Sequence, residues 1–108
     1  MLLVYINAPT RESALQIGRE LVASRLAAAV NLFAVESIYR WEETVHEGAE
    51  WTLAAKTTSE CFDALVASVK KQHPYSVPAI QAVEVPRVSR DYADWVAAST
   101  VAPAWIFD

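Results

Sequence analysis

The stretch SIYRWEETVHEGAEW, residues 37–51, predicts a long β-hairpin. Its first part alternates, so that Tyr39 and Trp41 share one face of a strand. We expect a turn at 46–48, where His, Glu and Gly follow one another, and a return strand that reaches Lys56. Two Trp, one Tyr and four acidic residues in so short a stretch are unusual for a hairpin that serves only its own domain.

The expected length of this hairpin is its second unusual property. Each strand would have about ten residues, or ~33 Å, whereas strands commonly have about five or six. A long exposed edge is normally blunted or paired with another chain, and Trp and Tyr are enriched in interface cores. We therefore expect the hairpin to extend beyond its own domain and to pair with a neighbouring subunit.

The segments around the hairpin predict an α+β fold. Outside the hairpin we expect strands at 2–8 and 76–86, an apolar run at 26–35 that leads into the hairpin, and helices at 10–25, 57–72 and 89–99. Thr10 is the expected cap of the first helix, and Thr57 with Glu60 has the spacing of a capping box for the second. The order matches the split βαβ, ferredoxin-like arrangement, with a four-stranded antiparallel sheet and two helices on one face.

Length and composition bound the classes of function. The 108 residues are expected to form a single domain, residues 1–108. Hydrophobic residues make up 54% of the chain, above the usual ~45–50%, and this surplus favours a protein partner. No apolar run is long enough to predict a membrane span. The net charge of −4 and the lack of a basic stripe argue against a nucleic-acid partner.

Cysteine usage and the first residues predict a cytoplasmic location. Cys61 is the only cysteine, so no internal disulfide can form. The first residues lack the cationic segment of a signal peptide, and their apolar run is too short for one. Cys61 has no cationic neighbour or second cysteine nearby, so we expect an inert thiol.

Five short stretches, each unspecific alone, occur in a specific order and spacing. They are SRLAAAVNL (24–32), SIYRWEETV (37–45), KTT (56–58), HPYSVPAI (73–80) and YADWV (92–96). Together they resemble the CutA family of divalent-cation tolerance proteins, over nearly the whole chain up to about residue 99. The resemblance implies a ferredoxin-like subunit and a homotrimer built by pairing long hairpins.

The resemblance also implies a function in the response to divalent metals. The family is linked to copper binding and metal tolerance and, in animals, to anchoring or processing of acetylcholinesterase. We expect a non-catalytic trimer that requires no cofactor and has Cu(II) or another divalent metal as a candidate ligand. The alternative is a small-ligand sensor with clefts between subunits, which resembles the nitrogen-regulatory signalling proteins at the level of fold.

His73 is the candidate metal ligand. It follows a helix end, and the resemblance places it at a family position associated with metal. Neutral imidazole is a common ligand of Cu(II), but a tight site needs three or four ligands. Ile6, Ala29 and Gln72 stand where relatives carry Cys or His. The alternative is that His73 ends the helix and forms local hydrogen bonds.

A second candidate site combines residues that the resemblance places around clefts between subunits. They are Tyr39, Trp41, Lys56, His73 and Tyr75. Lys56 could meet a carboxylate or phosphate group, and aromatic walls with one cation and one imidazole suit a small anionic ligand. The alternative is that the aromatic residues only pack the trimer.

The acidic residues of the hairpin and the C-terminal tail do not predict a further site. We expect Glu42, Glu43, Glu47 and Glu50 to be a solvated face rather than a metal site. Glu43 stands where the family has Gly, so the resemblance does not fix the path of the strand there. The sequence contains no nucleophile–base pairing, phosphate-binding loop or zinc-ligand spacing that would predict an enzyme. The tail, residues 100–108, has no expected element.

Overall fold

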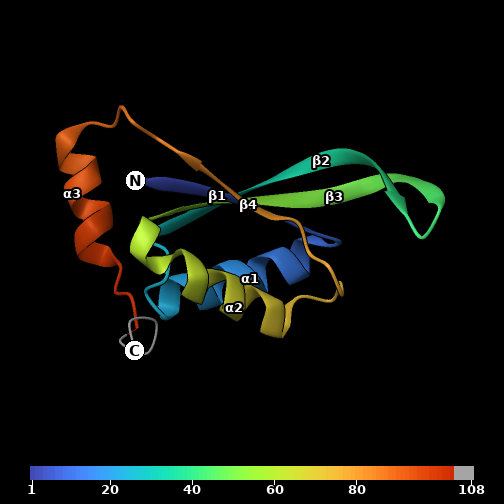
Figure 1. Cartoon of the computed structure of the whole chain (residues 1–108), viewed down its shortest axis with the longest axis horizontal. Coiled ribbons are helices and arrows are strands. Elements are labelled where there is room, and N and C mark those ends of the chain that lie inside the picture. Colours follow the sequence, from blue (N-terminus) through green and yellow to red (C-terminus); the bar gives the residue numbers. More distant parts are fainter. Residues whose placement is uncertain (104–108) are drawn as a thin grey trace.

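The computed structural model describes residues 1–103 and shows a four-stranded antiparallel sheet with strand order β2-β3-β1-β4 (Figure 1). The elements are β1 (Leu2–Ala8), α1 (Arg11–Ala23), β2 (Ala29–Trp41), β3 (Thr44–Thr57), α2 (Phe62–Gln72), β4 (Ile80–Glu84) and α3 (Arg90–Ser99). Helices α1 and α2 cover one face of the sheet, and α3 lies at one end. The predicted α+β, ferredoxin-like fold is confirmed. Residues 104–108, the end of the unassigned tail, lie outside the described residues.

The core lies between the sheet and the helices α1 and α2. β1 pairs with β3 on one side and with β4 on the other. Val4 and Ile6 of β1 are fully buried toward the helices, and Ile17 and Leu21 of α1 pack in the same core cluster. Thr10 caps α1 as the sequence predicts, because its hydroxyl accepts a hydrogen bond from the N–H of Ser13 at 3.0 Å. No helix within residues 1–103 has the length and apolar character to cross a membrane.

The second helix does not start at the predicted capping box. β3 continues through Thr57, whose hydroxyl donates a hydrogen bond to the carbonyl oxygen of Leu26 at 2.7 Å. Thr57 is fully buried, so its hydroxyl needs a partner inside the protein and is not available to cap a helix. A short 3₁₀ turn, Ser59–Cys61, follows instead, and α2 begins at Phe62.

The last helix is attached through the end of α1. Arg25 follows α1 with a φ of 62°, the left-handed region that commonly ends helices. Its guanidinium donates to the carbonyl oxygens of Ala98 at 2.8 Å and Ser99 at 3.3 Å. A cation at the C-terminal end of α3 is stabilising because the free carbonyls there carry partial negative charge. Val96 of α3 is buried.

The hairpin turn lies at Glu42 and Glu43, so the turn predicted at 46–48 is wrong. Both glutamates have positive φ, 49° and 68°, and Trp41 pairs directly with Thr44. Two-residue turns with positive φ match the twist of the strands they connect. Every residue of β2 therefore pairs with β3 without interruption, and residues 46–48 continue β3 instead of ending it.

The distal part of the hairpin protrudes from the domain (Figure 1). β1 pairs with β3 only between Trp51 and Thr57, so the part at 35–50, here called the hairpin arm, has no third strand beside it. Ile38 and Val45 on the arm are 72% and 55% exposed. Apolar side chains so far from the core favour a partner for the arm.

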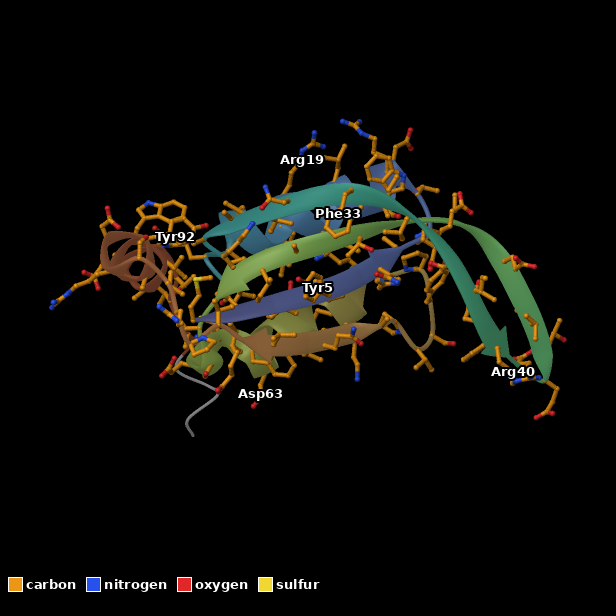
Figure 2. The ribbon with its side chains drawn as sticks, turned by 90° about the horizontal axis from the view of Figure 1, so that it is seen from above. Tyr5, Arg19, Phe33, Arg40, Asp63 and Tyr92 are labelled. Atoms are coloured by element: carbon orange, nitrogen blue, oxygen red, sulfur yellow. The ribbon has the colours of Figure 1, made fainter. Side chains whose placement is uncertain are left out.

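The sheet face opposite the helices, here called the open face, is also partly apolar. Figure 2 shows Tyr5 of β1 and Phe33 of β2 on this face. Phe33 is 44% exposed, and Val83 of β4 is 52% exposed. The outer edge of β2 bounds this face along the length of the hairpin. A long free edge next to an apolar face is the arrangement that proteins usually cover with another chain.

The turn position can be tested by substitution. We expect the double change Glu42→Asn with Glu43→Gly to raise the free energy of unfolding by about 1 kcal/mol, because Asn and Gly adopt positive φ at lower cost. The measurement is the midpoint of denaturant unfolding. As a control, Gly48→Val should be tolerated, since a Cβ at Gly48 meets no atom within 4 Å. If Gly48→Val lowered the free energy of unfolding by several kcal/mol and the double variant did not raise it, the turn would lie at 46–48 instead.

Candidate functional site

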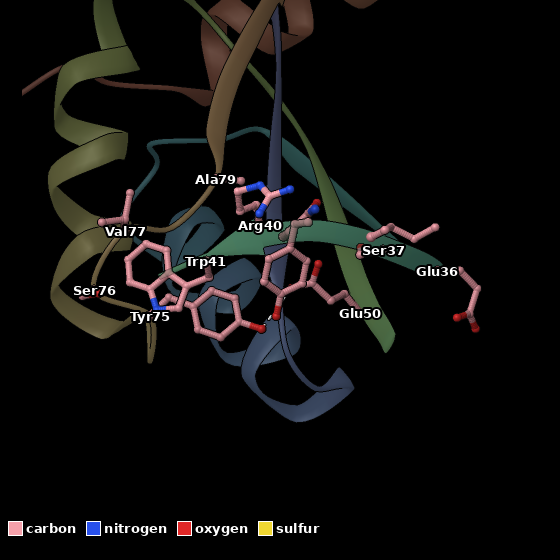
Figure 3. Close-up of a pocket in the computed structure, with 12 residues that line it drawn as sticks. Glu36, Ser37, Arg40, Trp41, Glu50, Tyr75, Ser76, Val77 and Ala79 are labelled. Atoms are coloured by element: carbon pink, nitrogen blue, oxygen red, sulfur yellow. Dashed lines mark hydrogen bonds between the residues drawn. The ribbon is translucent and has the colours of Figure 1, made fainter. Parts of the chain in front are cut away.

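A cavity of about 680 Å³ lies between the hairpin arm and the segment 75–79 that leads into β4 (Figure 3). Its size is within the ~300–1,000 Å³ of small-molecule sites. The lining comes from three parts of the chain: Asn7 of β1, residues of the arm, and residues after α2. The lining residues are Asn7, Glu36, Ser37, Ile38, Tyr39, Arg40, Trp41, Glu50, Tyr75, Ser76, Val77 and Ala79.

Glu50 and Tyr75 connect the two walls of the cavity. Glu50 of β3 is only 7% exposed, and the Tyr75 hydroxyl donates a hydrogen bond to its Oε2 at 2.9 Å. Burial, together with the hydrogen bond to Glu50 and its negative charge, raises the pKa of Tyr75 to about 12. Tyr75 therefore stays a neutral hydrogen-bond donor over the physiological pH range.

His73 ends α2 and holds the start of the following segment in place. The Tyr75 N–H donates to Nδ1 at 3.1 Å, and Nε2 lies 2.6 Å from the carbonyl oxygen of Asn7. Because an N–H can only donate, Nδ1 is the acceptor, and the ring proton is on Nε2, which donates to Asn7. His73 is also largely buried, at 8% exposed. His73 therefore ends the helix and forms local hydrogen bonds, as the alternative interpretation of the sequence expected.

The residues present do not fit a chelating copper centre within one chain. A metal at His73 would have to displace one of its two hydrogen bonds. Residues 1–103 contain no group of three or more His, Cys, Asp or Glu side chains that could hold an ion. His46 lies on the arm, stacked on Tyr39 with ring centroids 5.3 Å apart. The metal role of His73 stays a prediction.

The five residues predicted to surround a cleft do not all meet in one chain. Tyr39, Trp41 and Tyr75 line the cavity, and His73 lies beside Tyr75 with ring centroids 5.0 Å apart. Lys56 lies at the end of the hairpin farthest from the turn, where it pairs with Ala29. Trp41 lies at the other end, where it pairs with Thr44 next to the turn. Whether Lys56 completes a cleft from a neighbouring subunit stays a prediction.

Glu50 is the site residue that sequence reasoning missed. We expected it to be solvated, yet it is buried beside the aromatic wall. With the turn at 42–43, Glu50 pairs with Val35, which lies on the same face of β2 as Tyr39 and Trp41. That register is the signal that would have placed Glu50 on the same face as Tyr39 and Trp41.

Comparison with known proteins gives a consistent family. A family model described as CutA1 divalent ion tolerance protein matches residues 2–99. The chain is 39% identical over 101 residues to the divalent-cation tolerance protein CutA of Thermotoga maritima, covering 94% of this chain and 100% of that protein. It is 43% identical over 98 residues to CutA of Thermus thermophilus, covering 90% of this chain and 95% of that protein.

Known locations differ among such proteins. A solved structure from Archaeoglobus fulgidus, 34% identical with a TM-score of 0.89 over 92% of this chain and 98% of that one, is described as periplasmic. A relative from rice, 34% identical over 92% of this chain and 56% of that protein, is described as chloroplastic. The cytoplasmic location expected here therefore stays a prediction.

Solved structures share the complete fold. The divalent cation tolerance protein of Thermus thermophilus superimposes with a TM-score of 0.90 at 42% identity, covering 94% of this chain and 100% of that one. A protein from Nostoc described as the PII-like protein CutA, in apo form, gives 0.89 at 33% identity, covering 95% and 100%. The chain therefore belongs to the CutA1 divalent ion tolerance family.

Proposed function

We propose that this chain acts as a homotrimer of the divalent-cation tolerance type, without catalytic activity of its own. The observation that carries the proposal is the hairpin arm, whose two strands project beyond the rest of the sheet. Family membership supports the same function, since the relatives at 39% and 43% identity are divalent-cation tolerance proteins.

The physical argument for assembly rests on the edge of β2 and the open face. β2 has 13 residues and lies at the edge of the sheet, so its outward N–H and C=O groups can pair with another strand. Phe33 presents apolar surface beside this edge, and Val83 presents more on β4 at the opposite edge of the sheet. Closed cyclic assemblies cover such surfaces in every copy, whereas open ones leave one exposed at each end. A closed trimer would pair the free edge of β2 and cover the apolar open face in every copy.

The metal function proposed here does not need a resident copper ion in each subunit. Since both ring nitrogens of His73 are hydrogen-bonded, copper would bind there only by breaking a local contact. We propose weak copper contact at His73, or a site whose further ligands come from neighbouring subunits. Loss of the Tyr75 or Asn7 hydrogen bond would then accompany metal uptake.

Native mass spectrometry at micromolar concentration, with zero to three equivalents of Cu(II) per subunit, tests both the trimeric assembly and the weak copper contact. We expect a trimer without metal, because strand pairing and apolar contacts hold it together. We expect copper adducts only at excess Cu(II), reduced in His73→Gln and unchanged in the control His46→Gln. A monomer would contradict the assembly. Tight uptake of three ions per trimer that His73→Gln abolishes would contradict the hydrogen-bonded role of His73.

A second candidate function is that of a small-ligand sensor. The observation that favours it is the cavity of about 680 Å³ beside the arm. The Nostoc relative is described as PII-like, and we extend that likeness to this chain only as a proposal. Binding of a ligand at the arm would change the same element that we propose for assembly, which is how a sensor could pass on its state.

The sensor hypothesis predicts a ligand-dependent melting temperature. A panel of nucleotides, amino acids, organic acids and amines should contain compounds that raise it by several degrees, since a ligand that binds only the folded state stabilises it by mass action. Differential scanning fluorimetry on the trimer is the measurement. A panel without any concentration-dependent rise would leave the metal-tolerance function as the one supported.

A further inference from the structure

The protein holds the carboxylate of Glu50 through one of its two oxygens. Its Oε2 accepts the hydrogen bond from Tyr75. Oε1 has no such partner among residues 1–103 and still reaches solvent, because Gln72 Nε2 is the one fully buried polar side-chain atom there without a partner. A buried carboxylate is costly unless its oxygens have partners. Glu50 is more than nine-tenths buried and lines the cavity, so a ligand in the cavity can reach the oxygen that Tyr75 leaves free.

Aromatic rings form the wall around this carboxylate. Tyr39 and Trp41 line the cavity and are 44% and 43% exposed. Figure 3 shows the ring of Tyr75 between the indole of Trp41 and the side chain of Glu50. The faces of Trp and Tyr rings attract cations, most strongly when the cation is partly removed from water. A carboxylate inside an aromatic wall therefore favours a positively charged ligand.

The net charge of the residues that line the cavity also favours a cation. Glu36 and Glu50 supply two carboxylates, and Arg40 supplies one guanidinium, which leaves one negative charge among the lining residues. Glu36 and Arg40 both lie on the strand face opposite to Tyr39 and Trp41, so among the lining residues Glu50 is the charged side chain on the aromatic face. Lys56, the cation expected to attract an anion, does not line this cavity. Within one chain the site is thus suited to a cation.

We propose that the cavity binds a small primary amine in its ammonium form. The ammonium donates a hydrogen bond to Oε1 of Glu50, and its carbon chain lies against Trp41 and Tyr39. Tyr75 holds the carboxylate in place from the other side through its hydroxyl. The inference rests on the sensor function proposed above and gives its ligand class as a cation, in place of the anion expected from the sequence.

Three probes of equal length separate charge from size: butylamine, butyrate and 1-butanol. Titration calorimetry on the trimer should show butylammonium binding in the millimolar range and no measurable binding of the other two. Glu50→Gln keeps the size and an acceptor for Tyr75 but removes the charge, and it should weaken butylammonium binding by roughly tenfold to a hundredfold, as expected for a charged hydrogen bond. Glu47→Gln is the matched control.

The control residue is on the same arm but outside the cavity, because Glu47 pairs with Ile38 on the other strand face and does not line the site. Glu47→Gln should bind butylammonium like the unmodified protein. Stronger binding of butyrate, or equal binding of butylammonium by Glu50→Gln, would overturn the proposal. A trimer that binds none of the three probes would also overturn it. The native mass of each variant reports on assembly separately.

Discussion

The uninterrupted pairing of β2 with β3 is the constraint on which the rest of the structure depends. It starts at Ala29 opposite Lys56 and ends at the turn of Glu42 and Glu43. Because the side-chain period of a strand is two, this one register decides which residues of the arm face the cavity. It brings the aromatic residues of β2 to the side of Glu50 and leaves the outer edge of β2 free along its length.

The order of the elements follows from local patterns, whereas two local signals gave wrong positions. The strand expected at 2–8, the helix expected at 10–25 and the cap at Thr10 all agree with the tertiary structure, so the fold class could be predicted. Gly48 is a residue typical of turns, but strand pairing carries β3 through it and places two glutamates at positive φ instead. Thr57 likewise has capping chemistry, but burial gives its hydroxyl to Leu26.

The site was predictable in part. The resemblance drew attention to Tyr39, Trp41 and Tyr75, and these three line one cavity. Glu50 could not be found in this way, because its burial depends on the segment after α2 folding over the arm, a contact between residues 25 positions apart. The same segment fixes His73 through two hydrogen bonds. The cavity and the proposed assembly surface therefore share the hairpin arm, which would give a bound ligand a physical route to influence the proposed trimer.

Amide hydrogen exchange along β2, measured where the protein is fully assembled, tests the central claim most directly. The N–H groups of Ala29–Trp41 that do not bond to β3 point outward from the edge of the sheet. If the arm pairs with a neighbouring subunit, these outward amides should be protected about as strongly as those bonded to β3, since exchange would require the assembly to open. Rapid exchange of the outward amides beside protected inner ones would show a free edge and contradict the account.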